Sequence, residues 1–354
     1  MLKIINSALL LASAILGHPT DQPYTTNAVV PPTDAPSPVT TVSPGPVRPS
    51  SYTNLAVYME YNLNWNNVES DIQQALGWGY NTFYVGFYMS LYGCQGGCSE
   101  WINMDDTRRQ NIKQMLQTAG AKLILAVGGP GEFIEGVGNA DAWGQDAASF
   151  AKQYSFDGLD FAIALAGEPT PTYPSSYIGN NFFINVAQSL ATAGHNAGFS
   201  RSQMTISSHA PYFSAQYCNN NVKQSLSWLA LEQNKDQPWA VQFVNLDMIN
   251  EADHYMSFND IFIQNSYTAY AGSAVSEVAA LGIDLSNIAV IKPLTEDLGT
   301  VRTDWVSSSQ LAQWGCQFSS APYYGWGGFT MWTWELPTTQ QVTVYGQALD
   351  LSQC

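Results

Sequence analysis

Residues 156–164 read Phe-Asp-Gly-Leu-Asp-Phe-Ala-Ile-Ala, and this stretch decides how the rest of the chain is interpreted. The apolar residues of this stretch predict a β-strand over residues 158–163. Side chains on a strand point alternately to its two faces, so positions 160, 162 and 164 face the same way. Asp160 is therefore followed, on its own face, by two alanines, Ala162 and Ala164.

Further strands and helices alternate on both sides of this stretch. Strands are expected at residues 55–60, 82–87, 122–127, 158–163, 204–207, 240–246, 288–291 and 328–332. Helices are expected at residues 66–76, 105–119, 141–154, 180–197, 222–233, 260–280 and 308–316. This alternation predicts an α/β fold, a (β/α)8 TIM barrel, which typically needs about 250 residues. A doubly wound open sheet is the structural alternative, but no glycine-rich phosphate-binding turn follows the first strand.

The stretch resembles the fourth barrel strand of the family 18 glycoside hydrolases, the chitinases, where the pattern is D-G-x-D-x-D-x-E. Asp157, Gly158 and Asp160 match it, whereas Ala162 replaces the third aspartate and Ala164 replaces the glutamate that donates the proton. The resemblance implies a substrate-assisted reaction, in which the acid protonates the leaving oxygen and a carboxylate steadies the attacking acetamide of the sugar. Alanine can do neither, so Asp157 and Asp160 are interpreted as remnants of a lost catalytic site.

Two further segments are similar to motifs of the same family. Gly128-Gly129 matches the end of S-x-G-G on the third strand, with Ala126 in place of the serine. Residues 242–245, Gln-Phe-Val-Asn, are similar to the Q-F-Y-N of plant and fungal members, whose tyrosine helps to hold the acetamide. Val244 takes the place of that tyrosine, and the resemblance implies that Gln242 and Asn245 can still bind a sugar by hydrogen bonds.

The last strand supplies the aromatic residue expected beneath the sugar. Gly327-Gly328 and Trp332 match G-G-x-x-x-W, whose indole stacks on a pyranose ring; a tryptophan buried in the core is the alternative. Trp334 shares that face and is expected at the rim. The other candidates for substrate contacts are Tyr58, Phe87, Asp160 and Tyr212, with His209 equally interpretable as a loop histidine without a ligand.

The N-terminal 51 residues differ in composition from the rest. Residues 1–17 contain Lys3 followed by a short apolar run, which predicts a secretory signal peptide rather than a membrane anchor. Residues 18–51 hold nine of the 18 prolines and many Thr and Ser residues, which predicts a disordered, O-glycosylated linker. The barrel is expected to occupy residues 52–354.

Charge and cysteine content limit the partners. Because 28 acidic residues oppose 12 basic ones, nucleic acid and anionic membranes are poor partners, and a neutral polymer suits the surface better. No metal or other cofactor is expected, and the protein is expected to be a monomer. In an oxidising compartment Cys94 and Cys98 can form a disulfide, Cys316 can pair with Cys354, and Cys218 is the candidate free thiol.

The sequence thus predicts a secreted, extracellular chitinase-like protein that binds chitin or N-acetylglucosamine oligomers without cutting them. In a fungus living in a host, such a protein could hide chitin fragments from immune receptors. One alternative is an active chitinase that uses a displaced carboxylate, for which Glu168 is the candidate. Another is a barrel that binds and inhibits a foreign glycosidase.

Overall fold

The computed structural model describes residues 54–60, 63–130, 132, 137–163, 182–249, 254–298, 305–320, 325–335 and 338–349. The expected signal peptide and linker lie outside these residues, as do Ala164 and Glu168.

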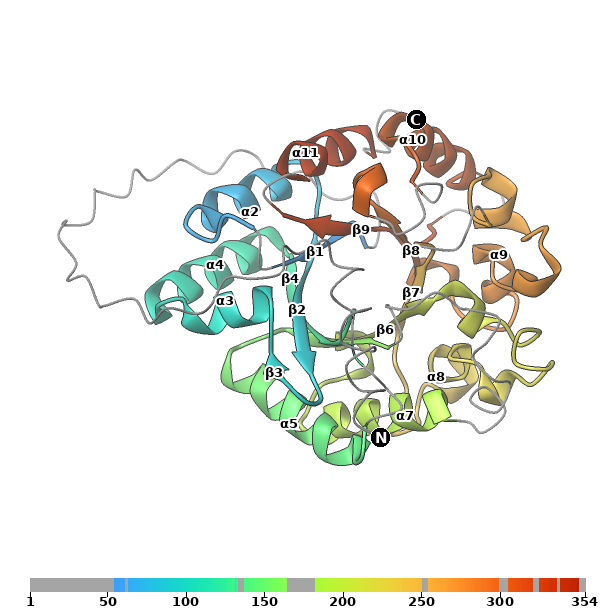
Figure 1. The fold of residues 1–354 in the computed structure, drawn as a ribbon, viewed down its shortest axis with the longest axis horizontal. Coiled ribbons are helices and arrows are strands. Elements are labelled where there is room, and N and C mark those ends of the chain that lie inside the picture. Colours follow the sequence, from blue (N-terminus) through green and yellow to red (C-terminus); the bar gives the residue numbers. More distant parts are fainter. Residues whose placement is uncertain are drawn as a thin grey trace, which may run out of the picture. The chain divides into compact units, whose positions relative to one another are not determined.

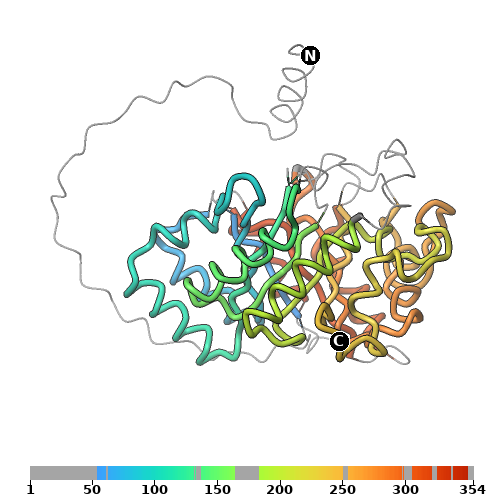
Figure 2. Tube along the Cα trace, turned by 90° about the horizontal axis from the view of Figure 1, so that it is seen from below, coloured from blue at the N-terminus to red at the C-terminus, as the bar shows by residue number. Residues whose placement is uncertain are grey.

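Nine strands form one sheet in the order β1-β9-β8-β7-β6-β5-β4-β2-β3, and β1 also pairs with β2. The pairing of β1 with both β2 and β9 is parallel and closes the sheet into a barrel. Figures 1 and 2 show the blue first strand beside the red last strand. The strands are β1 (Ala56–Met59), β2 (Thr82–Met89), β3 (Gly93–Cys94), β4 (Lys122–Gly128), β5 (Gly158–Ala162), β6 (Met204–His209), β7 (Phe243–Asp247), β8 (Ile288–Pro293) and β9 (Gly328–Trp334).

Helices surround the barrel, as Figure 1 shows in a view along its axis. They are α2 (Val68–Gly77), α3 (Gly97–Asn103), α4 (Asp106–Ala119), α5 (Ala140–Gln153), α7 (Phe182–Asn196), α8 (Ser227–Ala230), α9 (Val275–Ala279), α10 (Ser308–Phe318) and α11 (Thr339–Ala348). Short turns of 3-10 or π-helix are η2 (Arg201–Gln203), η3 (Ala210–Phe213), η4 (Val222–Gln224), η5 (Glu232–Asn234), η6 (Asn259–Ile263), η7 (Thr268–Tyr270), η8 (Leu285–Asn287) and η9 (Glu296–Leu298). The barrel predicted from the sequence is confirmed, with one addition: β3 pairs antiparallel with β2 as a hairpin.

The parallel strands of the barrel are largely buried on both faces, which is why most of them read as apolar runs in the sequence. Their outward side chains, such as Val57 and Phe161, pack in a large core against the helices. Their inward side chains form a second, smaller cluster, which includes Tyr58, Ala126 and Ala162. The barrel interior is therefore a packed layer rather than a channel.

Helix ends follow local capping chemistry. Asp105 accepts a hydrogen bond from the backbone N–H of Arg108 at 2.9 Å, and α4 ends at Ala119, followed by the capping residue Gly120, whose φ is +67°. Asn139 caps α5 in the same way, accepting from the N–H of Ala142 at 3.0 Å. Because an orphan N–H of the first turn gains a partner in each case, these helices begin where the sequence predicts, to within a residue.

Two expected helices are wrong. Residues 222–233 form η4, α8 and η5, and residues 260–280 form η6, η7 and α9, each separated by turns. In the second segment Asp260 accepts hydrogen bonds from the backbone N–H and the hydroxyl of Ser266, which takes backbone groups out of a helical ladder. Gly272 follows with a φ of +87°, a left-handed conformation that no helix continues through.

The cysteines behave largely as the sequence indicates. Cys94 and Cys98 form a disulfide across the turn from β3 into α3. Cys316 is disulfide-bonded, and its expected partner Cys354 lies outside the described residues. Cys218 is a free, buried thiol. No helix in the described part of the chain is both long and apolar enough to cross a membrane.

Candidate functional site

Three aromatic side chains from three strands meet at the carboxyl-terminal end of the barrel, where TIM barrels place their sites. Tyr58 (β1), Phe87 (β2) and Trp332 (β9) are called the mouth aromatics below. The ring centroids of Tyr58 and Phe87 both lie near Trp332, at 5.0 Å and 5.9 Å, and are 5.9 Å from each other. Tyr58 is completely buried and Phe87 is 5% exposed, whereas Trp332 is only partly buried. Trp332 is therefore the ring that a ligand can reach, and the other two support it.

Asp160 lies beneath these rings with both carboxylate oxygens occupied. The hydroxyl of Tyr58 donates to Oδ2 at 2.7 Å, and the hydroxyl of Ser207 donates to Oδ1 at 2.6 Å. Burial raises the pKa of Asp160 to about 7, and the two hydrogen bonds act in the opposite direction. Asp160 is fully buried, so it is a structural support of the mouth rather than a sugar ligand.

Ala162 lies one step nearer the mouth on the same face. It is fully buried in the inner cluster with Tyr58 and Phe87, as the strand alternation predicts. A methyl group occupies this position and cannot orient an acetamide.

The backbone conformation and close contacts at Gly128 and Gly129 explain why both residues are glycine. Both residues have positive φ, +101° for Gly128 and +94° for Gly129. A Cβ added to Gly128 would lie 2.4 Å from the carbonyl oxygen of Ala162, and one added to Gly129 would lie 2.3 Å from the ring of Phe87. The N–H of Gly129 also donates to the Ala162 oxygen at 2.8 Å. The pair thus lets β4 approach β5 and the mouth aromatics closely.

The expectation that Val244 faces the mouth is wrong. Asn245 points into the barrel, and neighbouring strand residues point to opposite faces, so Val244 points outward. Accordingly, Val244 packs in the outer core with Ile206 and Val290. The valine therefore does not replace a tyrosine of the site.

Gln242 and Asn245, which were expected to bind a sugar, hydrogen-bond to other residues of the barrel instead. Gln242 precedes β7, at the end of the barrel opposite the mouth, and its side chain donates to Asn287 at 3.1 Å. Asn245 is fully buried, donating to Tyr84 and Ser207 and accepting from Thr330. Both amides belong to the framework of the barrel.

Asp157 serves the framework as well. It lies just before β5, where one oxygen accepts from the backbone N–H of Leu123 at 2.8 Å and the other pairs with Lys113 at 2.5 Å. This carboxylate ties β4, α4 and β5 together at the end of the barrel away from the mouth.

A histidine and an aspartate lie at the mouth on neighbouring strands. His209 ends β6 and Asp247 ends β7, with His209 Nδ1 3.7 Å from Asp247 Oδ2 and both side chains buried. Tyr212, in η3, is 7% exposed and packs against the rings of Phe183 and His209. His209 and Tyr212 were predicted from the sequence, but Asp247 was not. Asp247 lies two residues after the inward-facing Asn245 on the same strand, and this spacing would have indicated it.

The sequence also missed a carboxyl group at the end of β1. Burial, and then the negative charge of Glu335, raise the pKa of Glu60 to about 8. A Cβ added at Gly96 would lie 3.1 Å from Oε2 of Glu60, so the carboxyl group sits against the turn before α3. Glu60 shares its strand face with Tyr58, which is the signal that could have found it.

The described residues contain no cluster of three or more His, Cys, Asp or Glu side chains that could hold a metal ion. No known family model matches the sequence, and no curated protein matches it.

Solved structures match the fold over most of the chain. A family 18 chitinase from Pseudoalteromonas aurantia is 12% identical, with a TM-score of 0.56, covering 83% of this chain and 100% of that one. A family 18 chitinase from Cycas revoluta in complex with (GlcNAc)3 is 12% identical, with a TM-score of 0.51, covering 84% and 100%. The xylanase–α-amylase inhibitor protein XAIP-I in complex with trehalose is 16% identical, with a TM-score of 0.51, covering 84% and 97%. The chain thus has the fold shared by family 18 chitinases and these inhibitor proteins.

Proposed function

We propose that this protein binds chitin or N-acetylglucosamine oligomers at the barrel mouth and does not hydrolyse them. The observation that carries the proposal is Trp332, partly exposed and supported from below by the buried rings of Tyr58 and Phe87. An indole face held in this way stacks on the apolar face of a sugar ring, and that contact needs no proton transfer.

We expect no hydrolysis because neither position 160 nor position 162, beneath Trp332, offers a carboxyl group that is free to act on a sugar. Ala162 stands where an aspartate would hold the acetamide, and Asp160 has both oxygens engaged by Tyr58 and Ser207. General acid catalysis requires a carboxyl group that can reach the leaving oxygen. In the sequence match to D-G-x-D-x-D-x-E, Ala164 takes the place of that acid, and loss of the acid removes a rate contribution of about 10²–10⁴-fold.

The test pairs calorimetric titration of chitohexaose with a hydrolysis assay on the same preparation. We expect binding without cleavage, and a Trp332→Ala variant that binds about 5-fold to 150-fold more weakly, since stacking on an aromatic platform is worth about 1–3 kcal/mol. Trp314→Ala is the matched control, because Trp314 is a partly buried tryptophan on α10, against the outer core. Unchanged affinity in a folded Trp332→Ala variant would remove Trp332 from the binding site.

The hydrolysis assay also tests the displaced-carboxylate alternative. If cleavage is detected, Glu60→Gln and Glu168→Gln identify its source: Glu60 because its carboxyl group is protonated near neutral pH, and Glu168 by its place in the sequence. Cleavage at ordinary chitinase rates contradicts the proposed function.

A second candidate function is the binding of another protein. The turn between β2 and β3 carries Leu91 and Tyr92, each 67% exposed, and the fold is that of the XAIP inhibitor proteins. If this turn inhibits a glycosidase, inhibition of a xylanase or an α-amylase should be lost in the double variant Leu91→Ser, Tyr92→Ser.

The cellular setting is part of the proposal. The N-terminal segment favours secretion, and a soluble chitin binder outside a fungal cell could sequester chitin fragments from host receptors. N-terminal sequencing of the protein recovered from culture medium tests this: a mature chain that begins near His18 supports it, and retention in the cells contradicts it.

A further inference from the structure

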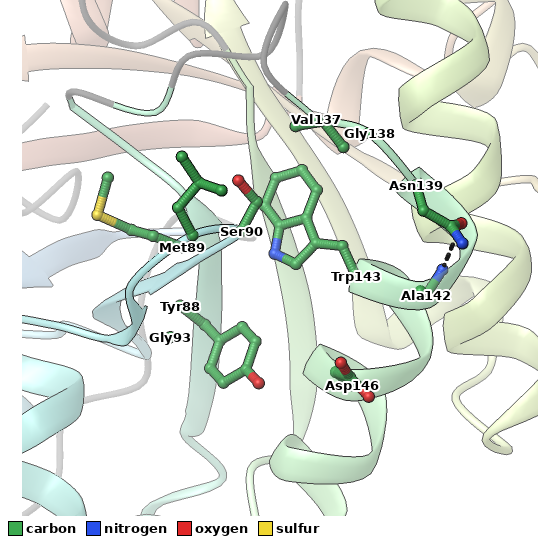
Figure 3. A pocket seen from close by; sticks show the side chains of 11 residues that line it. Tyr88, Met89, Ser90, Gly93, Val137, Gly138, Asn139, Ala142, Trp143 and Asp146 are labelled. Carbon is green, nitrogen blue, oxygen red and sulfur yellow. Dashed lines mark hydrogen bonds between the residues drawn. The ribbon is translucent and has the colours of Figure 1, made fainter.

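A separate cavity of about 350 Å³ lies between the β2–β3 hairpin and the first turns of α5 (Figure 3). The hairpin contributes Tyr88, Met89 and Ser90, and α5 contributes Trp143 and Asp146. None of the mouth aromatics lines this cavity. Of these lining residues, Met89 is the one that also packs against the inner cluster of the barrel.

Trp143 has a buried donor without an acceptor. The residue is 5% exposed, and within the described part of the chain its indole Nε1 has no hydrogen-bond partner. In Figure 3 the indole nitrogen lies on the ring edge that faces the side of Tyr88. A buried N–H left without an acceptor costs about 1–3 kcal/mol, so a group that accepts from it in the cavity would be stabilised.

The rest of the lining limits what that group can be. Asp146 brings a carboxylate, and the first turn of α5 is already capped by Asn139, so an anion finds neither a free cap nor a cation among these lining residues. The ring of Tyr88 packs on Phe150 at 4.8 Å, and burial and then the charge of Asp146 raise the pKa of the Tyr88 phenol. The cavity therefore offers a donor, an acceptor-only carboxylate, a neutral phenol and an aromatic ring.

A hydroxyl group fits this set because it both accepts and donates. An ammonium group could pair with Asp146, but it only donates and would leave the indole N–H unsatisfied. A purely apolar ligand would satisfy neither group. A compact ring with several hydroxyl groups combines the two hydrogen-bond roles with an apolar face for Tyr88.

We propose that this cavity is a second carbohydrate site, which takes one neutral sugar unit with a hydroxyl bound between the indole N–H of Trp143 and the carboxylate of Asp146. Its volume is at the low end of the ~300–1,000 Å³ range of small-molecule pockets, which suits a monosaccharide rather than a long chain. The proposal does not rest on the function of the barrel mouth.

The experiment is a ¹H–¹⁵N correlation spectrum of protein labelled on its 11 tryptophans, titrated separately with glucose and N-acetylglucosamine. The Trp143 indole peak is assigned by its loss in Trp143→Phe, which keeps an aromatic ring and removes the N–H. We expect that peak to shift saturably with at least one sugar, at a Kd in the millimolar range.

Variants separate this site from the mouth. Asp146→Asn should raise the Kd by roughly tenfold, because a hydrogen bond to a charged group is lost. Asp141→Asn is the matched control on the same helix. Trp332→Ala should leave the Trp143 shift unchanged, whatever it does to chitohexaose binding. If neither sugar moves the peak, if n-butylammonium moves it instead, or if the shift disappears in Trp332→Ala, the proposal is wrong.

Discussion

The hydroxyl of Tyr58 donates to Oδ2 of Asp160 at 2.7 Å and joins β1 to β5 inside the barrel. Ser207 holds the other oxygen at 2.6 Å from β6, so a single carboxyl group connects three strands beneath Trp332. Asp160 thus supports the mouth through its hydrogen bonds to two other strands, and it does so whether or not a sugar is bound.

Removal of the Tyr58 hydroxyl should reveal the charge of its partner. We expect Tyr58→Phe to lower the free energy of unfolding by about 1.5–3 kcal/mol at pH 8.5, where Asp160 is ionised, and by less at pH 5, where the acceptor is neutral. Urea unfolding at both pH values measures this. Tyr80→Phe is the control, because the Tyr80 hydroxyl donates to the backbone oxygen of Val342, whose charge does not change with pH. An equal loss at both pH values for Tyr58→Phe would contradict the assigned protonation of Asp160.

Stability should fall as the pH rises toward 8. The folded pKa values of Asp160 and Glu60, about 7 and about 8, lie above the ordinary carboxyl values of 3.8 and 4.5. The folded protein therefore binds more protons than the unfolded chain between about pH 4 and pH 8, and the free energy of unfolding decreases through this window.

Chemical denaturation from pH 5 to pH 9 tests this sign. Asp160→Asn should flatten the part of the curve below about pH 7, and Glu60→Gln the part that extends to about pH 8. A curve that rises with pH across this window in the parent protein would show that neither carboxyl group is protonated in the folded state.

The fold could be predicted from the sequence because the parallel strands of the barrel are largely buried on both faces. In residues 122–127, for example, every residue after the exposed Lys122 is apolar and buried, and β4 begins at the expected Lys122 and ends one residue beyond the expected end, at Gly128. The helices that failed are those in which polar side chains bond to the backbone locally. In residues 222–233, Ser225 donates to the oxygen of Val222, and Asn221 accepts from the N–H of Lys223, so turns replace a continuous helix.

The site could be predicted only on strands where the sequence showed which side chains face inward and which face outward. On β5 the alternation placed Asp160 and Ala162 correctly on the inner face. On β7 the match to a four-residue motif placed Val244 inward, but the strand begins at Phe243 and Asn245 is the inward residue. Because a shift of one residue reverses every side chain of a strand, a short motif match cannot fix which residues face the mouth.

Binding at the mouth should be insensitive to salt. Chitin is neutral and the contact at Trp332 is a stacking contact, so the affinity for chitohexaose should change by less than about twofold between low and high ionic strength. Titration calorimetry at two salt concentrations measures it. A strong decrease in affinity with salt would indicate an electrostatic protein partner and would favour the second candidate function.

One thiol should be detectable, and only after unfolding. Cys218 is 2% exposed, and burial raises the pKa of its thiol to about 12, while Cys94, Cys98 and Cys316 are disulfide-bonded. Ellman's reagent should find no reactive thiol in the native protein and one per chain in guanidinium chloride without reductant. Cys218→Ser should abolish that signal, and a native protein that reacts would contradict the burial of Cys218.

Restoration of catalysis is the sharpest test of the site. Ala162→Asp with Ala164→Glu would return the acetamide-orienting carboxylate and the acid at the two positions where the sequence departs from D-G-x-D-x-D-x-E. The new aspartate would share a face with Asp160, and like charges in proximity raise carboxyl pKa values, which keeps a proton available to the acid. We expect slow but detectable cleavage of chitohexaose, measured by product chromatography, well below the rate of a natural enzyme because the surrounding residues are not adapted to support the acid.

Addition of Val244→Tyr should harm this double variant rather than help it. Val244 is completely buried in the outer core, so a tyrosine there overpacks the space between β7 and the helices and costs about 1–3 kcal/mol or more. The triple variant should therefore have a lower Tm than the double variant and no higher rate. If it were instead equally stable and more active, residue 244 would face the mouth, and the register assigned to β7, with the framework role of Asn245 that depends on it, would be wrong.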